Sequence, residues 1–242
     1  MKERVFLMYS GGLDSILSMA KLIHSGYKVL LVHFDNGCTI SIGNEVLRAK
    51  QLEEAFGIDN VEYIGKISTL AGFRNNELEI ANMTFSQIKE NYGECTISQI
   101  RCLNCRSAMY REAIKYCLEN NIKYIAEGAR KSQLFSIEQP KMIESYKRLL
   151  SEFGIDLLLP VYDLDSDLER ENELLFYNIL PIPGEDSCIL GIPLKEPVSD
   201  EITDTIVKIF ENNIQPRYIK ELKGKSLIPQ LVHKCDRNIQ YF

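Results

Sequence analysis

The segment Ser10-Gly11-Gly12-Leu13-Asp14-Ser15 constrains this chain more than any other feature of its 242 residues. It separates a continuous apolar run, residues 5–9, from a stretch whose apolar residues recur at helical spacing. This pattern predicts a strand, a tight turn and a helix. Two glycines let the backbone turn sharply, so that turn amides, helix-start amides and the Ser10 and Ser15 hydroxyls face one concavity. Because the start of a helix is electropositive, the turn is suited to bind an anion.

Strand and helix signals continue to alternate along the chain. Apolar runs predict further strands at 27–34, 60–64, 124–127 and 157–161, and apolar residues at helical spacing predict helices at 44–56, 140–153 and 200–212 and one beginning near Cys105. Residues 68–99 are polar and less regular. Such alternation predicts an α/β fold, a doubly wound, mostly parallel, Rossmann-like sheet covered on both faces. We expect a main domain over residues 1–198 and a small helical, basic C-terminal extension over residues 199–242.

Composition narrows the class of protein. The net charge is −6, and no apolar run approaches the roughly 18 residues that cross a membrane. The amino-terminal residues lack the pattern of a secretory signal, so we expect a cytoplasmic protein with no membrane partner. The acidic balance argues against a protein wrapped in nucleic acid, but residues 214–242 are locally basic. That basic segment is either a solvated tail or a contact for a phosphate backbone.

Seven cysteines in a reducing compartment are metal ligands, redox groups or core thiols. Cys102 and Cys105 are spaced to share one metal or to form a redox pair. Cys188 lies in a turn-rich segment expected at the same sheet edge as the Gly-Gly turn. Three cysteines cannot close a tetrahedral zinc site, which leaves two alternatives: a cluster with one open iron, or zinc completed by Cys95 or a histidine. We expect Cys117 to be a buried thiol, and Cys38 and Cys235 to be bystanders.

The Gly-Gly turn resembles the PP-loop of the N-type ATP pyrophosphatases, whose pattern is Ser-Gly-Gly-x-Asp-Ser. It matches neither a Walker loop nor a dinucleotide fingerprint. The resemblance implies a fold of the adenine nucleotide alpha hydrolase type and a reaction in which a substrate oxygen attacks the α-phosphate of ATP. It assigns the phosphates to Ser10, Gly11, Gly12, Leu13, Asp14 and Ser15, with Mg²⁺ held partly by Asp14. His33 and Phe34 lie where this fold is expected to receive adenine and ribose.

A second resemblance follows from Cys102-x-x-Cys105-Arg106, Glu127-Gly128-x-x-x-x-Gln133 and the segment around Cys188. These residues resemble motifs of the tRNA 4-thiouridine synthetase (ThiI) family, and the wider PP-loop thiolases hold a 4Fe-4S cluster with a similar cysteine pattern. The likeness implies an ATP-dependent sulfurtransferase acting on a tRNA base, with Asp14, Cys102, Cys105 and Cys188 as catalytic residues and the three cysteines as cluster ligands. It also implies that Arg106 and Gly128 contact the nucleotide. The expected partners are a sulfide or persulfide donor, tRNA bound directly or through another protein, and a second copy of the chain in a homodimer.

Three alternatives remain. A related enzyme uses ammonia as the nucleophile, with zinc at the cysteines, as in the nitrile-forming deazaguanine synthases or amide-forming ligases. Sulfur transfer to a small molecule keeps the chemistry and changes the acceptor. A nucleotide-binding regulatory or sulfur-carrier module would have no turnover at all. The acidic run from Asp163 to Glu173 is interpreted as an exposed helical face and not as a metal site.

Overall fold

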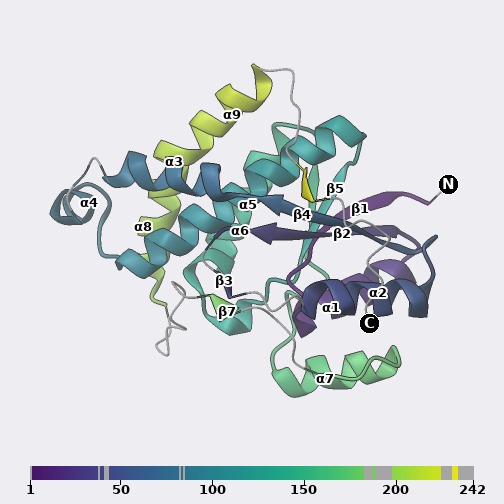
Figure 1. The fold of residues 1–242 in the computed structure, drawn as a ribbon. Helices are drawn as coiled ribbons and strands as arrows, with labels where there is room; N and C mark the ends of the chain where they lie inside the picture. The colour runs from purple at the N-terminus through teal and green to yellow at the C-terminus, as the bar shows by residue number, and fades with distance from the viewer. Residues whose placement is uncertain are drawn as a thin grey trace.

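The computed structural model describes residues 2–37, 39–40, 44–81, 83, 85–182, 187–188, 198–224 and 231–233, with the backbone alone for 39–40, 77–81, 85, 187–188 and 231–233. Figure 1 shows the fold. The strands are β1 (Arg4–Met8), β2 (Lys28–Asp35), β3 (Thr39–Ile40), β4 (Val61–Ser68), β5 (Tyr124–Glu127), β6 (Asp156–Leu158), β7 (Ser187–Cys188) and β8 (Leu231–His233). The α-helices are α1 (Leu13–His24), α2 (Asn44–Phe56), α3 (Leu70–Ala81), α4 (Phe85–Tyr92), α5 (Ile97–Asn120), α6 (Pro140–Ser151), α7 (Asp167–Phe176), α8 (Asp200–Ile209) and α9 (Gln215–Lys223). Two 3₁₀ turns, η1 (Lys131–Gln133) and η2 (Ser136–Glu138), and a π-helical turn, η3 (Phe210–Ile214), complete the described elements.

The main sheet has the order β6-β5-β1-β2-β4-β8. Its first five strands are parallel neighbours, and β8 pairs antiparallel with β4 at the edge. From β1 the chain builds β2 and β4 on one side and then returns to build β5 and β6 on the other. The predicted doubly wound, Rossmann-like fold is therefore confirmed, and a small antiparallel pair, β3 with β7, stands beside it.

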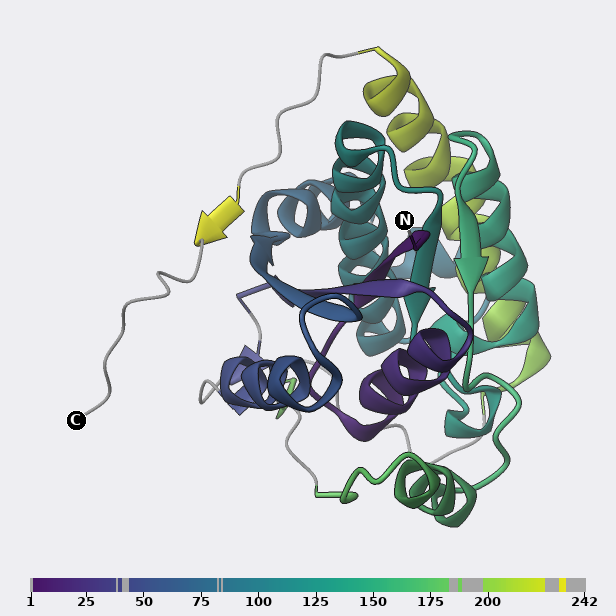
Figure 2. The same ribbon diagram turned by 90° about the vertical axis from the view of Figure 1, so that its right-hand side faces the viewer.

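Alternate residues of the central strands supply two hydrophobic cores, one on each face of the sheet. On one face, Phe6 and Val32 pack with residues of α5, α6, α8 and α9. On the other face, Leu7 and Leu31 pack with α1, α2 and α7. Figures 1 and 2 show these helices on opposite sides of the strands. Burial on both faces explains why β1 and β2 are almost continuously apolar rather than alternating.

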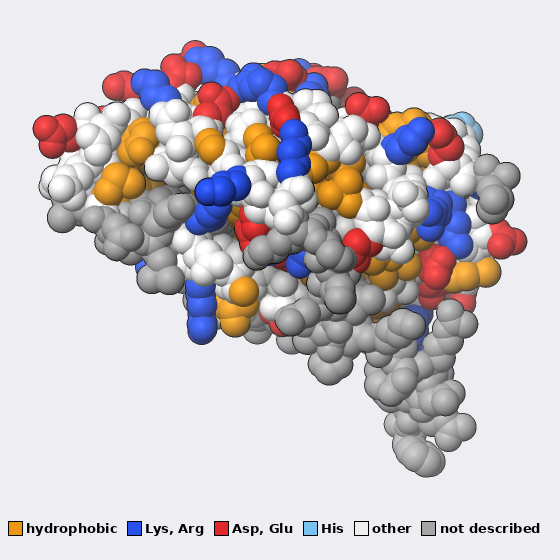
Figure 3. Space-filling model, turned by 90° about the horizontal axis from the view of Figure 1, so that it is seen from above, with side chains coloured by type: hydrophobic (Ala, Val, Ile, Leu, Met, Phe, Trp, Pro, Cys, Tyr) orange, Lys and Arg blue, Asp and Glu red, His pale blue; other side chains and the backbone are white. Residues whose placement is uncertain are grey.

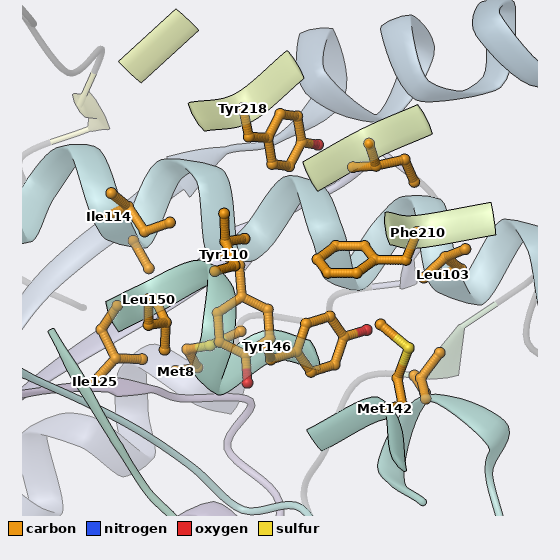
Figure 4. Close-up of a cluster of buried hydrophobic side chains, with 14 of the residues drawn as sticks. Met8, Leu103, Tyr110, Ile114, Ile125, Met142, Tyr146, Leu150, Phe210 and Tyr218 are labelled. Atoms are coloured by element: carbon orange, nitrogen blue, oxygen red, sulfur yellow. The ribbon is translucent and has the colours of Figure 1, made fainter. Parts of the chain in front are cut away.

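The helices that follow residue 198 belong to the first of these cores. Phe210 packs its ring against Tyr146, with 5.2 Å between ring centroids, and Tyr146 in turn packs against Tyr110. Figure 4 shows these rings together with Tyr218 and Leu103. Truncating a buried aromatic side chain of this kind costs about 3–5 kcal/mol of stability. Residues 200–224 thus share the core of the residues before 198, and the domain boundary near residue 198 stays a prediction.

Three expectations about helices need correction. Helix α5 begins at Ile97 rather than near Cys105, because Thr96 and Gln99 form a capping box there. The less regular stretch 68–99 contains α3 and α4, whose short, interrupted apolar stripes gave little periodic signal. The helix expected over 200–212 stays α-helical to Ile209 and continues as the π-helical turn η3.

The described surface carries charged side chains of both signs. On the face in Figure 3, basic and acidic side chains are interspersed. Side chains of the acidic run from Asp163 to Glu173 lie largely exposed, and no group of three or more metal-binding side chains gathers there in the described part of the chain. None of the described helices is both long and apolar enough to cross a membrane.

Candidate active site

The candidate site lies where the order of strand building reverses. In the sheet, β1 stands between β2 and β5, so the loops that follow β1 and β5 leave on either side of one crevice at the carboxyl ends of the strands. Open α/β sheets bind ligands at such a switch point. The loop of residues 10–15 follows β1, and Gly128 follows β5. The structure thus brings together two segments that are far apart in the sequence.

The PP-loop, residues 10–15, has the geometry of an anion cradle. Gly11 adopts a φ of 82°, which favours glycine, and Gly12 forms the N-cap of α1 without any side-chain cap. Within the loop, the Gly12 amide donates to Ser10 Oγ (3.2 Å) and Ser15 Oγ donates to the Gly12 carbonyl (2.8 Å). Because no side chain caps the first turn of α1, its amides and the helix dipole can act on a bound phosphate.

Gly128 is required by a close approach of two backbones. A Cβ placed at this position would lie 2.8 Å from both the Asp14 carbonyl carbon and the Ser15 nitrogen. Real Cβ atoms do not approach backbone this closely, so any larger residue would push the β5 loop away from the PP-loop. The glycine therefore fixes the width of the crevice, and its predicted contact with the nucleotide remains a prediction.

Asp14 lies in a charged group that we call the Arg130–Arg170 cluster: Arg130, Arg170, Asp14 and Asp167. Arg130 Nε lies 2.8 Å from Asp14 Oδ1, and Arg170 Nη1 lies 3.4 Å from Asp14 Oδ2. Gln133 also donates a hydrogen bond to Asp14 Oδ2 (2.9 Å). Burial raises the pKa of the Asp14 carboxyl, although both arginines act to lower it.

This arrangement does not fit a divalent cation at Asp14. Both of its carboxylate oxygens already face guanidinium groups. Among the described side chains, no group of three or more His, Cys, Asp or Glu is placed to hold a metal. We therefore assign no step to Mg²⁺ at Asp14.

The two residues expected near adenine and ribose lie at the carboxyl half of β2. His33 is buried, and its Nδ1 lies 3.2 Å from the carbonyl oxygen of Tyr9, just before the PP-loop. Phe34 packs its ring toward Phe6 in the core, with 6.0 Å between centroids. Their role in binding a nucleotide stays a prediction.

Cys102 and Cys105 lie one turn apart on α5, both half-buried. The Cys105 thiol accepts a hydrogen bond from Asn36 Nδ2 (3.1 Å), and Asn36 directly follows β2. The same loop continues into β3, where Thr39 pairs with the backbone of Cys188 in β7. One loop thus contacts the CxxC helix and pairs with the strand that carries Cys188, whose side chain lies outside the described atoms.

The remaining cysteines divide as follows. Cys117 is buried in the core, as predicted, and burial raises the pKa of its thiol. Cys95 is also buried, and its burial is the main cause of the raised pKa of its thiol. The role of Cys95 as a fourth ligand stays a prediction. Cys38 and Cys235 lie outside the described residues.

Arg106 belongs to a second charged group, the Arg106 cluster, with Glu127 and Glu138. Its guanidinium contacts Glu127 Oε2 at 2.5 Å and Glu138 Oε1 at 3.0 Å. Both carboxylates are buried, and burial raises the pKa of Glu138 to about 7 against the opposing effect of Arg106. The structure therefore gives Arg106 two carboxylate partners, and its predicted contact with ATP stays a prediction.

Sequence reasoning missed Glu138, Arg130 and Arg170. Arg170 lies within the acidic run that was interpreted as an exposed helical face, yet its side chain points to Asp14. The available signal was an arginine flanked by acidic residues after an N-cap serine, Ser166. That signal indicates a helix start but not which residue faces inward.

Comparison with known proteins places these features in a family. The chain resembles the solved structure of a 4-thiouridine synthetase in complex with RNA and bound ATP (TM-score 0.60, 16% identity), covering 93% of this chain and 55% of that one. It also resembles NMN synthetase from Francisella tularensis (TM-score 0.52, 12% identity), covering 95% of this chain and 90% of that one. At these identities the likeness shows the fold.

The chain thus spans little more than half the length of the 4-thiouridine synthetase that it matches. No curated protein sequence matches it. The family model described as Thiamine biosynthesis protein (ThiI) matches residues 1–146, which include the PP-loop, Cys102, Cys105 and Gly128. The chain belongs to the ThiI family, within the PP-loop ATP pyrophosphatases.

Proposed function

We propose that this protein is an ATP-dependent sulfurtransferase that adenylates a carbonyl oxygen of a tRNA base and replaces that oxygen with sulfur. The observation that carries the proposal is the loop after β2. Its Asn36 donates to the Cys105 thiol, and its continuation pairs with the strand of Cys188. The cysteines that are candidates for sulfur transfer and the PP-loop therefore lie near the same edge of the sheet, where its parallel strands end. Family membership and the fold of the RNA-bound, ATP-bound synthetase support the same reaction.

The proposed reaction begins when the carbonyl oxygen attacks the α-phosphorus of ATP. The bond to the β-phosphate breaks, and pyrophosphate leaves toward the PP-loop. Uncapped amides of α1 stabilise the leaving charge, and being fixed in place they need no reorganisation. Sulfur then attacks the carbon, and AMP leaves with the original oxygen. Mg²⁺ enters with ATP as part of the substrate.

The thiols have the chemistry to hold a 4Fe-4S cluster. Cys102 and Cys105 lie one turn apart, and the strand of Cys188 adjoins the loop that contacts Cys105. Cys102, Cys105 and Cys188 would hold such a cluster, and its fourth iron would be open to bind inorganic sulfide. The protein itself positions Cys105 through Asn36.

The test is thiolation of unmodified tRNA with Mg·ATP and sulfide under anaerobic conditions, read by mass spectrometry of the nucleosides. We expect Cys105→Ala and Cys188→Ala to abolish thiolation while ATP binding persists. Cys117→Ala is the matched control, since Cys117 lies on the same helix but in the core. Full thiolation by Cys188→Ala would contradict the cluster role, and iron and sulfide analysis of each variant measures the cluster directly.

A second candidate is an ATP-dependent ligase or nitrile synthase acting on a small molecule, with zinc at the cysteines. The fold likeness to NMN synthetase, which covers 95% of this chain and 90% of that one, supports this candidate. Stoichiometric zinc without iron, and AMP release with ammonia but not with sulfide, would support this candidate. Light scattering on the same preparation tests the expected homodimer.

A further inference from the structure

We propose that Arg130 and Arg170 form a clamp for the β- and γ-phosphate groups of ATP and for the departing pyrophosphate. This inference rests on the proposed use of ATP at the PP-loop and adds two residues to that site. Neither residue belongs to the PP-loop or to the cysteine motifs. Arg130 comes from the loop after β5, and Arg170 comes from α7.

Both arginine side chains are directed toward Asp14. The Arg130 side chain is 5% exposed and the Arg170 side chain is 13% exposed, and each guanidinium reaches the carboxylate of Asp14. Asp14 lies in the first turn of α1, the end of the helix whose amides are uncapped. Two cationic groups from separate elements therefore converge on the mouth of the PP-loop.

The Arg170 guanidinium has unmatched hydrogen-bonding capacity. Its Nε atom is buried and has no hydrogen-bond acceptor among the described residues, whereas Arg130 Nε pairs with Asp14 Oδ1 at 2.8 Å. A buried donor without an acceptor is costly, so such groups usually have a partner. A guanidinium presents its donors in a planar fork that matches phosphate oxygens.

Helix α7 is held against α1 by Leu174, which is fully buried, and by the ion pair between Lys21 and Glu173 (2.5 Å). Arg170 is thus fixed relative to the helix that follows the PP-loop. Groups held in place before binding stabilise developing charge better than groups that must reorganise.

The carboxylates that pair with the two arginines differ in exposure. Arg130 and Arg170 contact Asp14 and Asp167, and Arg170 Nη2 also lies 3.8 Å from the exposed Glu171. The Asp167 side chain is 68% exposed, so solvent can take over its charge when phosphate oxygens replace it. The aspartates therefore hold the two guanidinium groups in position and can be exchanged for phosphate oxygens.

The experiment compares three ligands on wild type, Arg170→Gln and Arg170→Lys. Pyrophosphate, ATP and AMP are each titrated by calorimetry. The clamp predicts that Arg170→Gln binds pyrophosphate and ATP about tenfold to a hundredfold more weakly, because a hydrogen bond to a charged group is lost. It predicts unchanged binding of AMP, which has no β- or γ-phosphate. Arg170→Lys keeps the charge, loses the fork and should fall between the two.

Arg148→Gln is the matched control, since Arg148 is an arginine paired with a carboxylate, Glu211, but on the exposed side of α6. Arg130→Lys extends the test if Arg170→Gln does not fold. Equal pyrophosphate affinity in wild type and Arg170→Gln would overturn the clamp, as would an equal weakening of ATP and AMP. Normal thiolation with an unaltered pyrophosphate affinity would reject the clamp alone. If the ligand affinities change as predicted but no tRNA is thiolated, the sulfurtransferase proposal is rejected and the clamp stands. A wild-type protein that binds no ATP would reject both proposals.

Discussion

Two charged groups that contain arginines involve residues on either side of Gly128 in the sequence, and they differ in their balance of charge. In the Arg106 cluster, one guanidinium lies between two buried carboxylates, each within 3.0 Å. In the Arg130–Arg170 cluster, two guanidinium groups face Asp14 and Asp167, Arg170 also lies 3.8 Å from Glu171, and Arg170 Nε lacks an acceptor among the described residues. The guanidinium of the first group is shared between carboxylates of β5 and η2. The guanidinium groups of the second group contact Asp14 in the PP-loop.

The comparison shows that burial of an arginine does not by itself indicate its role. The Arg106 cluster joins α5 to β5 and η2, so it places Cys105, the neighbour of Arg106, relative to the crevice. The Arg130–Arg170 cluster joins the β5 loop and α7 to Asp14. The Arg130 amide also lies 3.4 Å from Glu138 Oε2, so a change in one cluster can reach the other.

The largest effect is expected for Arg106→Met. Removal of the guanidinium leaves Glu127 and Glu138 buried without their shared cation. Breaking a buried ion pair in this way costs about 3–5 kcal/mol. Urea denaturation measures the loss, and Arg148→Gln, which removes an exposed pair, should cost at most about 1 kcal/mol. A loss below about 1 kcal/mol for Arg106→Met would remove the distinction between the two clusters.

The next effect is a pH dependence from Glu138. Its pKa is raised by burial to about 7 from the ordinary 4.5, so the folded protein retains this proton where the unfolded chain has lost it. The stabilising contribution is complete below pH 4.5 and is lost as pH rises through 7, by up to about 3 kcal/mol. Glu138→Gln cannot titrate, so wild type should lose stability relative to Glu138→Gln over this window. A constant difference between the two from pH 4.5 to 7.5 would contradict the prediction.

Gly128→Ala tests the spacing between the two clusters. The added methyl would meet the backbone of Asp14 and Ser15 at 2.8 Å, so the β5 loop must move. We expect at least about a tenfold loss of ATP affinity and a stability loss of about 1–3 kcal/mol. Gly57→Ala is the control: its φ of +81° strains an alanine, but nothing lies within 4 Å of the new methyl. That variant should lose stability without losing ATP affinity, and a Gly128→Ala protein with normal affinity would show that the crevice tolerates widening.

The smallest effect is expected for Asp167→Asn. The hydrogen bond from Arg130 lowers the pKa of Asp167, but the side chain is largely exposed and its ion pairs are screened. We expect a stability change below about 1 kcal/mol and a pyrophosphate affinity that rises a few-fold, since one competing carboxylate is gone. Calorimetry with pyrophosphate measures this rise. A weaker affinity would mean that Asp167 orients Arg130 rather than competing for it.

The sequence pattern predicted the alternating architecture well because both faces of the central strands are buried. Residues 124–127 and 44–56 match β5 and α2 at both ends. The start of α5 was wrong because the capping box at Thr96 lies in a polar stretch whose apolar period is weak. Helices α3 and α4 were missed for a related reason, since packing against other helices stabilises them more than their own periodicity.

Within the candidate site, the sequence by itself determined the anion cradle. A Gly-Gly turn between a buried strand and a helix has few backbone solutions, and Gly11 adopts the positive φ that such a turn requires. The spacing of Cys102 and Cys105 predicted that the two thiols could act together, and the start of α5 at Ile97 places both on one helix.

Only the tertiary structure decided which distant groups meet at that cradle. It paired Arg106 with two buried carboxylates. It also placed Arg130 and Arg170 beside Asp14, and the loop after β2 beside Cys105. Local propensity acts over one turn of helix or one strand pair, whereas these contacts join residues up to 156 positions apart. Which residues meet in these contacts depends on how the sheet twists and how the helices pack on it. No short segment of the chain determines either property.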